Sequence, residues 1–135
     1  MKKVLTFGVF DILHRGHIRL FERAKQLGDS LIVAVQTDEN ILKYKPNTQI
    51  INNLEERIYM VNSIRFVDVV LCYDDVDEAV KTIDFDVLVL GEDQNHMGFQ
   101  RAREWCSMHK KEVVVLERTN GISSTKLRET KASNK

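Results

Sequence analysis

Two histidines three residues apart are the residues best suited to chemistry in this sequence. His14 and His17 lie on either side of Gly16, after a short apolar segment (4–8) and at the start of a segment with helical spacing. Unpaired N–H groups at a helix start favour an anion, and imidazoles there add donors to phosphate oxygens. Gly16 removes a side chain where a ligand would approach the backbone. The pattern therefore predicts a phosphate site.

Two roles that involve no phosphate stay open for the histidine pair. One histidine can cap the helix while the other packs against the sheet. A metal site would need a third ligand, for which Asp11 is the nearby candidate, and this interpretation is weaker. We expect no metal held by protein side chains alone. The turn also lacks G-x-G-x-x-G, which disfavours NAD.

A second candidate phosphate site follows the last predicted strand. Arg118 can bind phosphate oxygens through two N–H groups, and hydroxyls at a helix start are further donors. An ordinary N-cap sequence is the alternative interpretation. The other residues of this segment to which we assign a role are Gly121, Ile122, Ser123, Ser124 and Thr125.

Alternating strand and helix patterns must position these two segments. Strands are predicted at 4–8, 31–36, 66–73, 85–90 and 113–116, and helices at 16–27, 54–64, 74–82, 99–110 and from 118. The polar stretch 37–53, with the only proline, is predicted as an irregular loop over a site. This order predicts one α/β domain over 1–135, with a Rossmann-like, doubly wound, mainly parallel five-stranded sheet. Ligands bind such sheets beyond the carboxyl ends of the strands.

Composition excludes several classes of protein. The chain has 135 residues, of which 43% are apolar and 30% charged, so disordered and fibrous classes are excluded. Its net charge of +0 gives no field that would attract nucleic acid, which we do not expect as a partner. The apolar runs are too short for membrane insertion, and no signal peptide is visible, so we expect a cytoplasmic protein. Cys72 and Cys106 lack C-x-x-C spacing and are predicted to be buried thiols.

The motifs resemble those of the nucleotidylyltransferase superfamily. His14-Arg15-Gly16-His17 is similar to its H-x-G-H signature, and 118–125 resembles its R-T-x-G-I-S-[ST]-[ST] element. The resemblance to bacterial glycerol-3-phosphate cytidylyltransferases covers most of the chain, including 21–29, 37–39 and 64–68. It implies a homodimer that transfers CMP from CTP to a small phosphorylated alcohol such as glycerol 3-phosphate. A divalent cation, usually Mg²⁺, would accompany the triphosphate, and the product would serve cell-surface polymer or capsule synthesis.

The resemblance also implies a role for each site residue. The two histidines would stabilise charge on the α-phosphoryl oxygens, the loop lysines would close over the phosphates, and Arg57 would hold the acceptor phosphate. Catalytic roles fall on His14, His17, Lys43 and Arg118. Nucleotide binding falls on Gly8, Val9, Phe10, Gly16, Lys45, Glu92, Asp93 and the segment 121–125, and acceptor binding on Asp11, Arg57 and Gln94.

Most of these residues have a structural alternative. Lys43 and Lys45 can be solvated surface charges. Arg57 can pair with Glu55 or Glu56, and Asp11 can orient a backbone N–H or a histidine. Arg65 and Asp68 can bridge a helix and a strand.

Departures from the family pattern leave the acceptor open. Val9 replaces a threonine, and Gln94 begins a segment (94–100) that differs from the family, which has a tryptophan after Asp93. His96 and Arg101 can contact an acceptor unlike glycerol or belong to the capping of the next helix. Phosphoethanolamine, phosphocholine or a phosphonate as acceptor, and ATP as donor, are therefore alternatives. A catalytically silent nucleotide-binding module is the alternative of another class.

Overall fold

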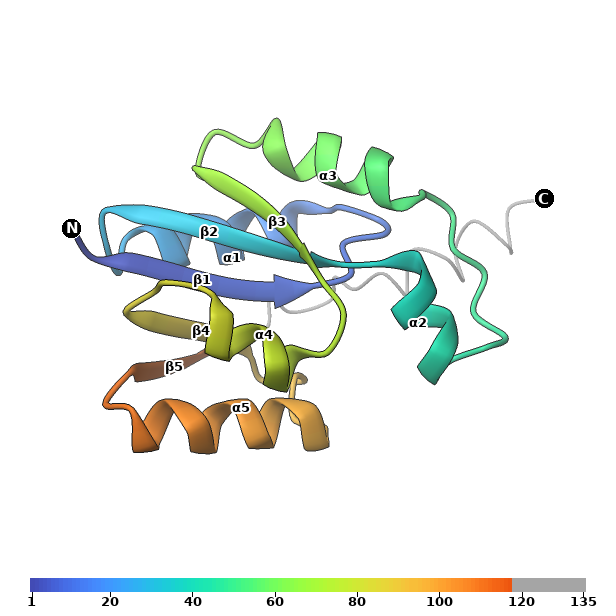
Figure 1. Ribbon diagram of the computed structural model, residues 1–135. Helices are drawn as coiled ribbons and strands as arrows, with labels where there is room; N and C mark the ends of the chain where they lie inside the picture. The colour runs from blue at the N-terminus through green and yellow to red at the C-terminus, as the bar shows by residue number, and fades with distance from the viewer. Residues whose placement is uncertain (118–135) are drawn as a thin grey trace.

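The computed structural model describes residues 1–117, which form a five-stranded parallel sheet in the order β3-β2-β1-β4-β5 (Figure 1). The strands are β1 (Lys3–Gly8), β2 (Ser30–Gln36), β3 (Val69–Tyr73), β4 (Val87–Gly91) and β5 (Glu112–Leu116). The helices are α1 (Arg15–Lys25), α2 (Asp38–Tyr44), α3 (Leu54–Asn62), α4 (Val76–Thr82) and α5 (Met97–Met108). The predicted Rossmann-like α/β class is confirmed. Strand order reverses between β1 and β4, where such folds bind ligands.

Apolar side chains fill both faces of the sheet. Helices α1 and α3 cover one face and α4 and α5 the other (Figure 1). Along β1, Val4 packs into the α1 layer and Leu5 into the α4 layer, as alternation along a strand requires. Burial on both faces explains why β1, β2 and β4 show apolar runs without polar alternation. The two layers hold the carboxyl ends of β1 and β4 in place.

Helix α2 corrects the prediction of an irregular loop over 37–53. The Thr37 side chain caps this helix by accepting the backbone N–H of Asn40, at 3.2 Å. Asp38 in the first turn suits the positive end of the helix dipole, and Ile41 is buried. Only the second part of the predicted loop, after Lys45, is irregular.

Strand β3 begins three residues later than predicted. The segment before it turns, with the Val67 N–H donating to the Ile64 carbonyl at 3.0 Å. Asp68 forms a salt bridge with Lys25 of α1 and accepts the Leu31 N–H of β2, at 2.8 Å. Asp68 therefore bridges a helix and a strand, as its structural alternative states. Arg65 makes a different contact, since its guanidinium lies 5.0 Å from the centre of the neighbouring Phe66 ring.

The edge position of β3 corrects the prediction for one thiol. Cys72 is exposed because no strand pairs with the outer edge of β3 among the described residues, whereas Cys106 lies on the buried face of α5 as predicted.

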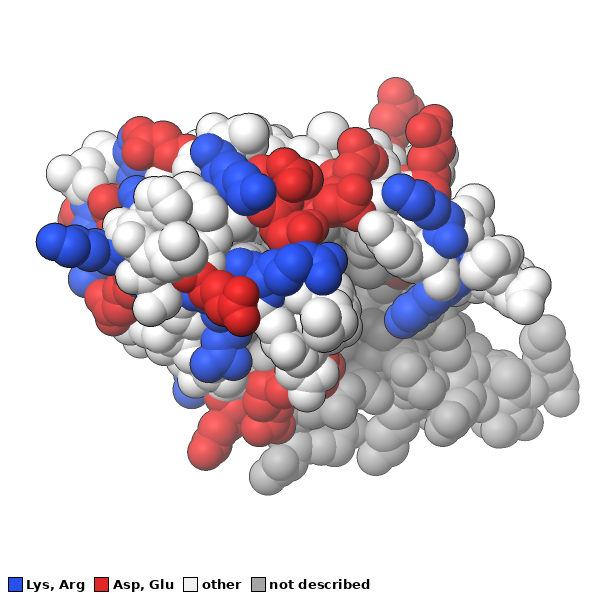
Figure 2. Space-filling view, turned by 60° about the horizontal axis from the view of Figure 1, so that its bottom comes forward, with Lys and Arg blue, Asp and Glu red and all other residues white. Residues whose placement is uncertain are grey.

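Charged side chains of both signs alternate over the face formed by α4 and α5 (Figure 2). Two ion pairs belong to this region, Arg101 with Asp77 at 2.9 Å and Lys81 with Glu78 at 3.5 Å. The mixture agrees with the neutral composition. Within residues 1–117 no helix has the length and apolar character needed to cross a bilayer.

Candidate functional site

His14 and His17 cap the start of α1 at the carboxyl end of β1. His14 is the N-cap residue, and its Nδ1 accepts the Gly16 N–H at 3.1 Å. His17 completes a reciprocal capping box, because its Nδ1 accepts the His14 N–H at 3.3 Å. The two rings stack with their centroids 3.9 Å apart. Capping therefore fixes both imidazoles through the Nδ1 atom of each ring.

The caps also decide the tautomer of each histidine. A ring nitrogen that accepts an amide N–H carries no proton, so in a neutral imidazole the proton lies on Nε2. Burial, together with a smaller effect of the neighbouring His14, lowers the pKa of His17 to about 4. His17 is consequently uncharged at neutral pH, with Nε2–H as its remaining donor. This is a suitable group to meet a phosphate oxygen.

Phe10 gives the first turn its shape. Its backbone has a φ of 55°, in the left-handed region, and its ring packs edge-on against His17 and Phe21 at 5.4 and 5.2 Å. Gly8 is needed beneath this ring, because a Cβ there would lie 2.5 Å from Cζ of Phe10. The contacts of these two residues are thus structural, and their predicted contact with a nucleotide stays a prediction, as does that of Val9.

Asp11 ties the first turn to the irregular segment after α2. One carboxylate oxygen accepts the Ile51 N–H at 3.0 Å, and the other accepts the Asn52 N–H at 2.7 Å. The Asn52 side chain donates in return to the Asp11 carbonyl at 2.6 Å. The structural alternative for Asp11, orientation of backbone N–H groups, is confirmed. The predicted contact of Asp11 with an acceptor stays a prediction.

Arg57 lies behind the site rather than in it. Its side chain is fully buried and forms a salt bridge with the Asp38 carboxylate. Its other donors reach the carbonyls of Val9 at 3.0 Å, Gln36 at 2.6 Å and Asn52 at 3.0 Å. We therefore correct two predictions: Arg57 pairs with neither acidic neighbour on α3, and its guanidinium contacts protein groups instead of standing open to an acceptor phosphate.

Lys43 and Lys45 lie at the end of α2, which is fastened to the start of α4. The Tyr44 hydroxyl donates to the Asp75 carboxylate at 2.6 Å, and Asn40 donates to the same oxygen at 3.3 Å. Both lysines are exposed, with the Lys43 ammonium 5.4 Å from the centre of the Tyr44 ring. They therefore extend from an anchored helix. Their predicted contact with phosphates stays a prediction.

Glu92 and Asp93 lie in the turn after β4. The Asp93 carboxylate raises the pKa of His17 against the larger effect of burial, so this turn faces the start of α1 across the gap between β1 and β4. Carboxylates here can contact a ribose or a cation that a nucleotide carries. No cluster of three metal-ligating side chains occurs within residues 1–117.

Gln94 uses both polar atoms of its amide within the fold. The side-chain oxygen accepts the Gly91 N–H at 3.0 Å, and the side-chain nitrogen donates to the Phe7 carbonyl at 2.7 Å. These contacts are structural, and the predicted contact of Gln94 with an acceptor stays a prediction. Nearby, His96 caps α5 by accepting the Gly98 N–H at 3.2 Å, as its structural alternative states, whereas Arg101 forms an ion pair with Asp77 of α4 and takes no part in this cap.

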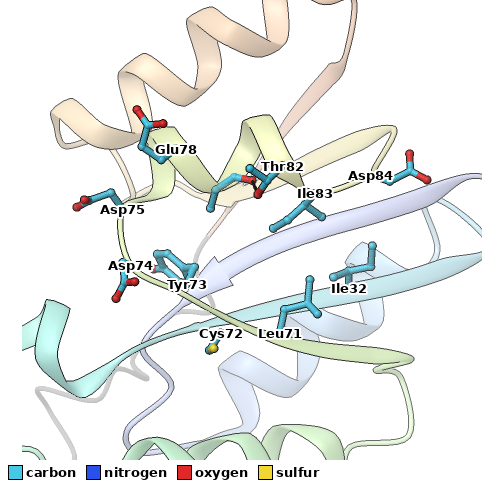
Figure 3. Close-up of a pocket in the computed structure, with 11 residues that line it drawn as sticks. Ile32, Leu71, Cys72, Tyr73, Asp74, Asp75, Glu78, Thr82, Ile83 and Asp84 are labelled. Carbon is cyan, nitrogen blue, oxygen red and sulfur yellow. Dashed lines mark hydrogen bonds between the residues drawn. The ribbon is translucent and has the colours of Figure 1, made fainter.

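A pocket of about 720 Å³ lies elsewhere, between α4 and the edge strand β3 (Figure 3). Apolar side chains form much of its wall, and acidic side chains lie around it (Figure 3). None of its lining residues is Lys, Arg or His. The lining residues are Ile32, Leu71, Cys72, Tyr73, Asp74, Asp75, Glu78, Ala79, Thr82, Ile83 and Asp84. This pocket therefore offers no positive charge to a triphosphate.

The second predicted phosphate segment lies outside the described residues. Arg118, Gly121, Ile122, Ser123, Ser124 and Thr125 are all among residues 118–135. Their approach to the histidines stays a prediction.

A parallel sheet with an anion-binding helix start at its switch point defines a Rossmann-like nucleotide-binding domain. Comparison with known sequences then gives the family. A sequence model of the cytidylyltransferase-like family matches residues 5–130, and the chain belongs to that family. The match includes both predicted phosphate segments.

Individual relatives agree with this assignment. A glycerol-3-phosphate cytidylyltransferase of Bacillus subtilis (strain 168) is 44% identical over 133 residues, covering 96% of each chain. Its namesake in Staphylococcus aureus (strain NCTC 8325 / PS 47) is 41% identical, covering 96% of this chain and 94% of the relative. The solved structure of a lipopolysaccharide core biosynthesis protein from Thermoplasma volcanium GSS1 has a TM-score of 0.71 at 26% identity, covering 88% of this chain and 97% of the other.

Sequence reasoning missed the residues that support the site. Asp38 and Asn52 anchor Arg57 and the first turn, and Tyr44 with Asp75 anchors α2. The sequence held a signal for α2, since Thr37 precedes two acidic residues as an N-cap does. It held none for the partners of Arg57, which lie up to 48 residues away.

Replacing Arg57 should destabilise the fold. Arg57→Lys keeps the charge but cannot reach all four partners, and Arg57→Met leaves buried carbonyls without donors. We expect the free energy of unfolding to fall by about 2 kcal/mol for the lysine variant and by about 3–5 kcal/mol for the methionine variant. Urea denaturation measures both. Arg101→Lys, at an exposed ion pair, is the control and should cost less than about 1 kcal/mol; equal losses at the two sites would contradict the role of Arg57.

His17 should stay neutral well below pH 6. Its pKa of about 4 in the folded chain is below the value of 6.5 for a free imidazole, so the unfolded chain takes up the proton first. Stability should therefore fall as the pH falls from about 6.5 to about 4. Histidine NMR titration measures the midpoint and the Nε2–H tautomer. Asp93→Asn, which removes the opposing charge, should lower the midpoint further; a midpoint near 6.5 would disprove the assignment.

Proposed function

We propose that this chain transfers CMP from CTP to glycerol 3-phosphate and releases pyrophosphate. The observation that carries the proposal is the pair of stacked imidazoles, fixed by their caps at the sheet switch point with Nε2–H as donor. Support comes from the near full-length similarity to proteins named glycerol-3-phosphate cytidylyltransferase.

In this reaction an oxygen of the acceptor phosphate attacks the α-phosphorus of CTP. The bond from the α-phosphorus to the bridging oxygen breaks, and pyrophosphate leaves with the electron pair. Because a phosphate monoester has its second pKa near ~6, the nucleophile is already ionised and no general base is needed. Positioning and charge stabilisation should then supply most of the acceleration.

The histidines would donate hydrogen bonds to the α-phosphoryl oxygens, on which charge increases during attack. Lys43 and Lys45 would approach the phosphates from the end of α2, and Arg118 with the hydroxyls of 123–125 would hold the leaving pyrophosphate. Mg²⁺ would enter with the triphosphate, bound mainly by phosphate oxygens and water.

The proposal also covers the oligomeric state, the cellular location and the biological role of the chain. We take the active form to be a homodimer in the cytoplasm that supplies an activated precursor for cell-surface polymer or capsule synthesis. The exposed apolar Val69 and Leu71 on the edge strand β3 support a contact between subunits.

A panel of donors and acceptors tests the function. Pyrophosphate release should be seen with CTP and glycerol 3-phosphate, and not with ATP. The other acceptors in the panel are phosphoethanolamine, phosphocholine and a phosphonate, each offered with either nucleotide. Turnover with ATP but not CTP would overturn the cytidylyl assignment. Binding of CTP without pyrophosphate release from any pair would favour the silent nucleotide-binding module.

Removing either imidazole should lower turnover without unfolding the chain. His14→Asn keeps an N-cap oxygen for the Gly16 N–H but removes the ring donor, so the thermal midpoint should change little. We expect kcat to fall about 10²–10³-fold for His14→Asn and His17→Ala, the scale for losing a preorganised donor. Steady-state pyrophosphate release gives kcat, with His109→Ala at the far end of α5 as control. A loss below about tenfold would be inconsistent with the assigned role.

A further inference from the structure

Strands β1 and β4 separate at the edge of the sheet that carries the site. Their pairing covers three residue pairs and ends at Thr6 and Val89. Beyond this point β1 continues beside β2 as far as Gly8, and β4 continues beside β5 as far as Gly91. The separation opens the switch point, and it leaves backbone groups on the facing edges without a partner strand.

Side chains take the place of the missing backbone bonds. The Thr6 hydroxyl, fully buried, donates to the Val89 carbonyl at 3.0 Å. One step further out, the Gln94 carboxamide lies between the strands, accepting from the Gly91 N–H of β4 and donating to the Phe7 carbonyl of β1. A carboxamide has the same donor and acceptor as a peptide group, so it can stand in for one rung of the ladder.

The geometry points to Gln94 as a positioning residue that sets the width of the nucleotide crevice by bridging β1 and β4 where their backbone pairing ends. It acts through the two segments that it joins. On one side, Phe7 leads directly into the turn that carries Phe10 and the histidines. On the other side, Gln94 closes the turn that carries Asp93, since its N–H donates to the Gly91 carbonyl at 3.1 Å.

The surroundings of Gly91 agree with this role. A Cβ at Gly91 would lie 3.1 Å from the Asp93 carboxylate and 3.9 Å from the Gln94 side-chain oxygen, so the turn folds back closely onto the strand end. Asp93 is held where its charge reaches His17. A change in the bridge would therefore move a carboxylate relative to an imidazole across the crevice.

Two substitutions separate the two hydrogen bonds of Gln94. Gln94→Leu has neither donor nor acceptor. Gln94→Glu still accepts the Gly91 N–H, but its carboxylate cannot donate to the Phe7 carbonyl, and it regains that donor when it is protonated. Gln100→Glu is the matched control, because the Gln100 amide donates to the Asn95 carbonyl, without bridging strands.

Amide exchange tests the bridge without any ligand. We expect the Gly91 amide to exchange faster in Gln94→Leu and to keep its protection in Gln94→Glu and Gln100→Glu. An unchanged Gly91 exchange rate in folded Gln94→Leu would overturn the bridge.

Binding of CTP with Mg²⁺, measured by calorimetry, tests the positioning role, which rests on the proposed function. At pH 8 we expect about tenfold weaker binding for Gln94→Leu and Gln94→Glu, and no change for Gln100→Glu. The ratio of the Kd of Gln94→Glu to that of the unaltered chain should fall as the pH is lowered toward the ordinary Glu pKa of about 4.3. Asp93 and His17 are present in both proteins, so their own titration affects both values in that ratio. Unaltered affinity in both Gln94 variants would overturn the positioning role.

The outcomes keep the two claims apart. If the unaltered chain itself binds no CTP, the proposed function fails, and the positioning role in nucleotide binding falls with it. Gly91 exchange in Gln94→Leu then decides the bridge alone: faster exchange supports it, and an unchanged rate overturns it.

Discussion

A single buried guanidinium holds together the segments that form the site. Arg57, on α3, reaches the turn after β1 through Val9, the end of β2 through Gln36, and the start of α2 through Asp38. A charge without exposure to water is tolerated only when its donors are satisfied, so each of these partners must stay within hydrogen-bond distance. The positions of the first turn and of α2 are therefore linked energetically. Any ligand that moves one of them acts on the other.

The same principle applies to backbone groups near the site that have no partner in a neighbouring strand or helix. Asp11 satisfies two N–H groups of the segment after α2, and Gln94 satisfies one N–H and one carbonyl between β1 and β4. These polar residues shape the site from behind it. Under the proposed function, the contacts with the ligand would then come from the capped histidines and from the charges that the family pattern assigns. The cost of burying polar groups is offset because every group has a partner with good geometry.

This division explains what the sequence could predict. Buried strands and the histidine helix start follow from short-range patterns, and the sheet and the placement of His14 and His17 agree with them. A polar residue's choice between ligand and backbone depends on distant segments: Gln94 reaches a carbonyl 87 residues earlier in the chain. Spacing contains no information about such partners. Helix α2 was missed for another reason, because the proline that follows it and the lysines at its end outweighed the N-cap signal at Thr37.

The capped histidines also constrain how the proposed reaction distributes charge. Two rings stacked 3.9 Å apart would repel each other if both were charged, and burial keeps His17 neutral. The neutral Nε2–H of His17 would attract a ground-state triphosphate less than a cation would. Its hydrogen bond would strengthen as charge increases on the α-phosphoryl oxygens, which favours the transition state over the bound substrate. Under the proposed function, the full positive charge that offsets the leaving pyrophosphate would come from Lys43, Lys45 and Arg118, whose contacts with phosphate stay predictions.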